Sequence, residues 1–97
     1  MSTPAAVEPP TPENLHLYRA AVLAWREAAI EERSRHADVR LSNPHVAKHA
    51  AARAVHELAP EMTYDEAWWL AHKTTSWAAQ AYHEWFWRGI PDNGYGL

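Results

Sequence analysis

The sequence predicts an all-α fold, a small three-helix bundle with a disordered, proline-rich N-terminus and an irregular C-terminal tail. Three observations support this prediction. Apolar side chains recur at spacings of three and four over three long stretches, which is the period of an amphipathic helix. Each stretch starts with a capping residue and ends near a helix-terminating signal. The connections are short, which favours neighbouring helices running up, down and up.

The first helix is predicted over residues 12–36, after a disordered lead-in over 1–11 that contains three prolines. Thr11 supplies a capping hydroxyl and Pro12 suits the first helical position. The expected core face consists of Leu15, Tyr18, Ala21, Val22, Trp25 and Ala29. Leu23 and Ile30, seven residues apart, fall on the opposite, polar side. They are either ordinary surface residues or a contact strip for a partner.

The second helix is predicted over 44–58, because Asn43 and Pro44 repeat the cap-and-proline start and Pro60 ends the helix. Its core side is rich in alanine, which lets a neighbouring helix approach closely and lets large rings fill the remaining space. We therefore expect the aromatic rings of the third helix to lie against it. The connector over 37–42 is expected to tuck Val39 and Leu41 beneath the helices.

The third helix is predicted over 64–88 and contains five of the six tryptophans. Thr63 and Glu66 have the spacing of a capping box, and Gly89 followed by Pro91 supplies the stop. The turn-forming residues after Gly89 predict an irregular tail over 90–97. The expected core face is Ala67, Trp68, Leu70, Ala71, Trp77, Ala78, Ala81, Tyr82, Trp85 and Phe86.

The composition narrows the functional class. Without cysteine, the chain has neither disulfides nor thiolate metal sites. No apolar run is long enough for a bilayer span, and no signal peptide is evident, so a cytoplasmic protein without membrane contacts is expected. A net charge of −3 argues against nucleic-acid binding. Abundant alanine and arginine with scarce lysine is typical of GC-rich genomes, such as those of actinobacteria and their phages.

The outer face of the third helix is the main candidate for a binding surface. With Ser76 included, its residues follow one stripe at steps of three and four from Trp69 to Trp87, and a tryptophan at each end is unusual on the surface of a monomer. The predicted contact residues are Trp69, His72, Gln80, His83 and Trp87, with Leu23 and Ile30 as a second strip. The alternative is that connectors or the tail cover both rings.

The seven histidines raise a second hypothesis, since His45 and His49 are spaced to chelate a transition metal on one helical face. A complete site needs a further ligand from another helix. The alternative is a set of solvated surface histidines.

No nucleophile–base–acid arrangement, HExxH motif, phosphate loop or dinucleotide fingerprint occurs. The sequence therefore favours a non-catalytic protein–protein interaction module without a cofactor. In this hypothesis the chain is an accessory or regulatory protein that docks on a larger protein or on a second copy of itself. A helical small-ligand- or metal-binding protein is the alternative.

Overall fold

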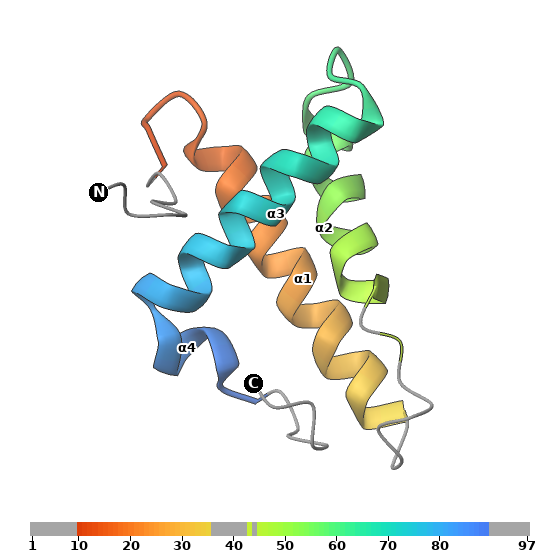
Figure 1. The fold of residues 1–97 in the computed structure, drawn as a ribbon, viewed down its shortest axis with the longest axis vertical. Coiled ribbons are helices and arrows are strands. Elements are labelled where there is room, and N and C mark those ends of the chain that lie inside the picture. The colour runs from red at the N-terminus through yellow and green to blue at the C-terminus, as the bar shows by residue number, and fades with distance from the viewer. Residues whose placement is uncertain (1–9, 36–42, 44, 90–97) are drawn as a thin grey trace, which may run out of the picture.

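The computed structural model describes residues 10–35, 43 and 45–89, and its elements there are all helical. The helices are α1 (Leu15–Arg35), α2 (His45–Leu58), α3 (Tyr64–Ala81) and the short α4 (His83–Trp87). This confirms the all-α, three-helix prediction, with α4 as an addition. In Figure 1, α2 runs back alongside α1, α3 crosses over both, and α4 turns back beneath the end of α3. Residues 1–9 of the predicted lead-in, the connector with Val39 and Leu41, and the tail over 90–97 lie outside the described residues.

The start of α3 follows its predicted capping signal, whereas α1 begins three residues later than Thr11 and Pro12 predict. Thr63 Oγ1 accepts a hydrogen bond from the backbone N–H of Glu66, and Glu66 Oε1 accepts one from the backbone N–H of Thr63. The predicted capping box is therefore confirmed. The first helix starts later than predicted, because residues 12–14 form a turn and the helix begins at Leu15. The second helix ends at Leu58, two residues before Pro60, as predicted.

The centre of the bundle is built from alanines. Ala21 of α1, Ala51 and Ala52 of α2, and Ala67 and Ala71 of α3 are almost completely buried, together with Val55. Small side chains let the three helices approach closely. Larger side chains pack around this cluster: Leu17, Trp25, Met62, Trp68 and Leu70. The expectation that rings cover the alanine face of α2 holds for Trp68 of α3, and Trp25 of α1 joins it.

The prediction of one continuous helix over 64–88 is wrong, because the helix is interrupted at Tyr82 (φ −128°, ψ 50°). Neither glycine nor proline causes this break. After it, α4 directs Phe86 into the core, where 1 % of its surface is exposed and its ring lies 4.8 Å from that of Trp25. Burying a phenylalanine stabilises by roughly 1.5–3 kcal/mol, which offsets the loss of helical hydrogen bonds at the break.

The interruption also changes which side chains are buried. Ala81, Tyr82 and Trp85, all predicted in the core, are exposed. Thr74 and Thr75, in contrast, are buried. Their hydroxyl groups donate to the backbone oxygens of Leu70 and Ala71 at 2.6 and 3.0 Å, so burial leaves no hydroxyl without a partner. Leu15 of α1 was likewise expected inside and is about half exposed.

Among the described helices, none combines the length and the apolar character needed to cross a bilayer.

Candidate functional site

The predicted strip on α3 is exposed over its first part. Trp69 is 63 % exposed, the largest fraction among the large hydrophobic side chains of the described residues. Its ring meets that of His72 edge-on, with the ring centroids 5.9 Å apart. His72 and Gln80 are exposed as well. The first three predicted contact residues are therefore accessible, and their role in binding a partner stays a prediction.

The strip does not continue past Tyr82, because the chain changes direction there. His83 is exposed on α4. Trp87 is half-buried and packs edge-on against Trp25 and Phe86, at centroid distances of 5.6 and 4.9 Å. Trp87 is thus part of the packing that holds α4, rather than the free indole expected from a continuous helix.

The two residues of the second predicted strip lie in different environments. Leu23 is 49 % exposed. Ile30 is half-buried and packs beside Ala29 of α1 and Ala47 of α2. Only Leu23 is therefore available as an apolar contact.

Leu23 belongs to an apolar groove of about 340 Å³ between the first half of α1 and the end of α3 with α4. Most of its wall is apolar or aromatic: Leu15, Tyr18, Val22, Leu23, Trp77, Ala78, Tyr82 and Trp85. Four of the seven exposed large hydrophobic side chains of the described residues lie here, with Leu15 at 47 %, Leu23 at 49 %, Tyr82 at 56 % and Trp85 at 40 %. Together these exposed side chains and the more buried ones between them line one continuous apolar groove.

The aromatic wall of this groove is held by defined contacts. Trp77 lies edge-on to both Tyr18 and Tyr82, at centroid distances of 6.1 and 5.4 Å. Arg26 of α1 stacks on Trp85, with its guanidinium carbon 4.5 Å from the ring centroid. The same guanidinium donates to the backbone oxygens of Phe86, at 3.0 Å, and Arg88. Arg26 thereby fastens α4 to α1 and fixes one side of the Trp85 ring.

Sequence reasoning missed this groove because it placed Tyr82 and Trp85 in the core. The available signal was the width of the apolar arc on the third helix, which contains more large rings than one face can bury. Leu15 and Leu23 of α1 both line the groove, although Leu15 was expected on the core face and Leu23 on the polar side of that helix.

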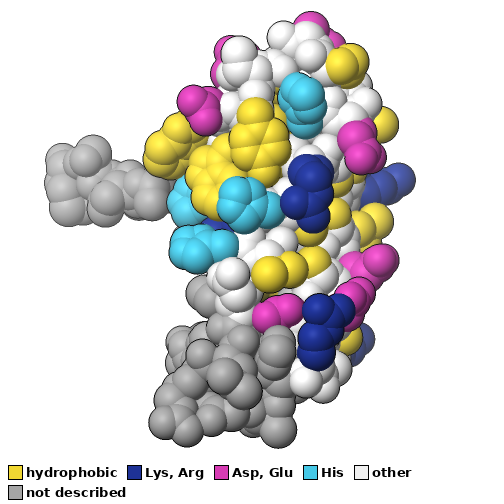
Figure 2. Space-filling model, turned by 90° about the vertical axis from the view of Figure 1, so that its right-hand side faces the viewer, with side chains coloured by type: hydrophobic (Ala, Val, Ile, Leu, Met, Phe, Trp, Pro, Cys, Tyr) yellow, Lys and Arg dark blue, Asp and Glu magenta, His cyan; other side chains and the backbone are white. Residues whose placement is uncertain are grey.

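The histidines of α2 form a different surface. His49 Nδ1 lies 2.8 Å from the hydroxyl of Tyr64, and its ring is 4.9 Å from that of Trp68. His56 meets Tyr64 edge-on. Figure 2 shows histidine side chains lying among large hydrophobic ones on this side of the molecule. His49 is thus engaged with aromatic side chains of α3.

This arrangement bears on His45 and His49 as candidate metal ligands. Within the described ranges, no three histidine, cysteine, aspartate or glutamate side chains are grouped so that they could hold a metal ion. His45 and His49 therefore gain no third ligand from a neighbouring described helix, and the geometry gives no support to a metal centre there.

Comparisons of this chain with known protein families, curated proteins and solved structures found no match.

Proposed function

We propose that this protein is a small, non-catalytic interaction module that binds a larger protein through the apolar groove between α1 and the α3–α4 end. The single observation that supports this most strongly is the gathering of four exposed, large apolar side chains on one groove. Isolated surface leucines are ordinary. A contiguous apolar surface is costly in water and is typical of binding sites.

The chemistry of the lining favours a protein partner. Its aromatic rings are fixed by one another and by Arg26, so they lose little conformational freedom on binding. Aromatic and arginine side chains are the usual anchors of protein interfaces. Arg19 is an exposed cation on the edge of the groove, which suits a partner with an acidic residue beside its apolar ones.

The shape of the groove favours a helical segment of that partner. Its two walls are themselves helices, and the apolar stripe of a third amphipathic helix fits between two such walls. The surface of the groove is almost entirely apolar, whereas small-molecule sites usually add a few placed polar groups that orient the ligand. Trp69 and His72, the exposed part of the predicted strip, do not line this groove.

Site-specific photo-crosslinking in the native host tests the proposal. A benzophenone amino acid replaces Leu23 in one variant and Glu57, an exposed residue of α2, in the control. We expect one discrete adduct from position 23, none from position 57, and loss of the adduct when Trp85→Ala is added. Equal crosslinking from both positions, or an adduct that survives Trp85→Ala, contradicts the proposal. An adduct of twice the chain mass identifies a second copy as the occupant and overturns the larger partner.

A further inference from the structure

A second hollow, of about 170 Å³, is lined by side chains of α1, α2, α3 and α4. Its lining combines indole rings from Trp25 and Trp87 with polar side chains from Lys48, His72 and Ser76. It shares no lining residue with the apolar groove. It therefore has to be explained separately from the proposed docking of a partner protein.

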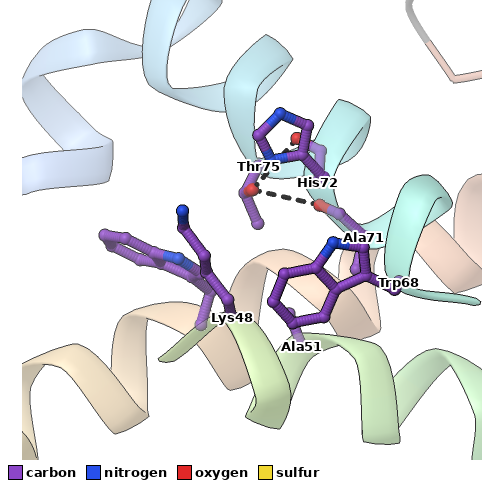
Figure 3. Close-up of a pocket in the computed structure, with 7 residues that line it drawn as sticks. Lys48, Ala51, Trp68, Ala71, His72 and Thr75 are labelled. Carbon is purple, nitrogen blue, oxygen red and sulfur yellow. Dashed lines mark hydrogen bonds between the residues drawn. The ribbon is translucent and has the colours of Figure 1, made fainter. Parts of the chain in front are cut away.

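The polar side of this hollow is centred on Lys48. Figure 3 shows Lys48 reaching from α2 toward Thr75 of α3, beside the ring of Trp68. Between Lys48, Trp68 and Thr75 the hollow continues into a narrow space of about 10 Å³, which is the size of a single water molecule. Lys48 is half-buried, so the stem of this side chain is already ordered against the protein.

The polar groups of the lining include an ammonium and a hydroxyl that can donate hydrogen bonds to an anion. Lys48 makes no ion pair with any residue in the described ranges. The Thr75 hydroxyl donates to the backbone oxygen of Ala71 at 3.0 Å, so its hydrogen is already used. The Lys48 ammonium and the Ser76 hydroxyl can still donate, and no carboxylate lines the hollow. The site thus presents donors and positive charge beside an aromatic surface.

We propose that this hollow binds a small planar carboxylate, with its ring against the indoles of Trp25 and Trp87 and its carboxylate on Lys48. The hollow has room for one or two fused rings. A single ammonium matches the charge of a monoanion, and a charge-assisted hydrogen bond in a half-buried place is stronger than a neutral one. The inference does not depend on the proposed partner groove.

Titration of the full-length, ¹⁵N-labelled protein with 2-naphthoate tests this assignment, with the indole N–H signals in the NMR spectrum as the readout. We expect saturable binding with a dissociation constant of about 1 mM or below, and the largest shifts at Trp25 and Trp87. The neutral 2-naphthamide has the same shape without the charge. It should bind about tenfold more weakly or worse, because it loses the charge-assisted hydrogen bond.

The two lysines of the chain provide matched variants, since Lys73 is exposed on α3 and lies outside the hollow. Lys48→Met keeps most of the side-chain volume and should weaken naphthoate binding by about tenfold, whereas Lys73→Met should leave it within about twofold. Circular dichroism checks that both variants are folded. Equal affinities for acid and amide, equal effects of the two substitutions, the largest shifts at Trp77 and Trp85, or no saturable binding would each overturn the proposal.

Discussion

The two halves of α3 contact the rest of the bundle in opposite ways. In the first half, Ala67 and Ala71 pack against Ala51 and Ala52 of α2, and the helices are in close contact. In the second half, Ala78 and the following Phe86 are surrounded by large rings, among them Trp25, Trp77 and Trp87. The first half makes a closed interface, whereas the second half leaves a groove on one side and a hollow on the other.

The difference shows how side-chain size decides between packing and binding in so small a domain. Facing alanines let the helices approach closely, and the space that remains beside Ala51 and Ala71 is only about 10 Å³. Large rings at the crossing of α3 over α1 cannot all enter the same volume, and the break at Tyr82 selects Phe86 for burial while Tyr82 and Trp85 stay outside. The surface available for partners is therefore a direct consequence of how the second half packs.

The strongest test of this comparison uses two neighbouring aromatic residues of α4. Phe86→Ala should lower the free energy of unfolding by about 3–5 kcal/mol, because it removes a fully buried ring and leaves a cavity. Trp85→Ala should cost no more than about 1 kcal/mol, which is the size of an exposed cation–π contact. Urea denaturation followed by circular dichroism measures both losses. Similar losses would show that Trp85 belongs to the core, and the groove would then be a packing defect rather than a binding surface.

In the closed interface made by the first half of α3, we expect that replacing a buried alanine with a larger side chain destabilises the fold. Ala51→Leu adds more volume than the water-sized space beside Ala51 can accept and should cost about 1–3 kcal/mol. Ala81→Leu, on the exposed end of α3, is the matched control and should change stability by less than about 0.5 kcal/mol. The same denaturation experiment compares them. If Ala51→Leu were tolerated as well as Ala81→Leu, the alanine interface would not be closely packed, and the contrast between the halves would disappear.

Local signals in the sequence were sufficient for the parts of the fold that local chemistry determines. Thr63 and Glu66 form the predicted capping box, Pro60 follows the end of α2 as expected, and Gly89 adopts the positive φ of 83° that suits a helix stop. These features depend on residues close in the chain, so their spacing alone predicts them.

The break at Tyr82 could not be predicted in this way, since it depends on contacts with α1. No glycine or proline marks it, and it is supported by Arg26, which donates to the backbone oxygens of Phe86 and Arg88 from 60 and 62 residues away in the sequence. If the helix over 64–88 were straight, its apolar spacing would place Tyr82 and Trp85 in the core and Trp87 on the surface. The misplacement of Tyr82, Trp85 and Trp87 follows from that assumption, whereas the partial burial of Ile30 comes from its packing beside Ala29 and Ala47.

The smallest expected effect concerns the N-terminal cap of α3. It tests whether the first half of α3 can be destabilised without affecting the second half. Thr63→Ala removes the capping hydroxyl of α3 and should cost about 1 kcal/mol. Glu66→Gln is the matched control, because glutamine keeps the reciprocal hydrogen bond to the backbone of Thr63 and should be nearly neutral. Both residues are exposed and distant from the groove.

The loss in Thr63→Ala is expected to be confined to the start of α3. Hydrogen exchange should become faster at the first-turn amides, above all at that of Glu66, which donates to Thr63 Oγ1. The indole signals of Trp77 and Trp85 should stay unchanged, because the second half is held independently by Phe86 and Arg26. Shifts at these indoles comparable to those at the first turn would mean that α3 responds as one unit. The interface between α2 and the first half of α3 would then determine the shape of the groove. Substitutions in that interface would alter partner binding although the substituted residues do not contact the partner.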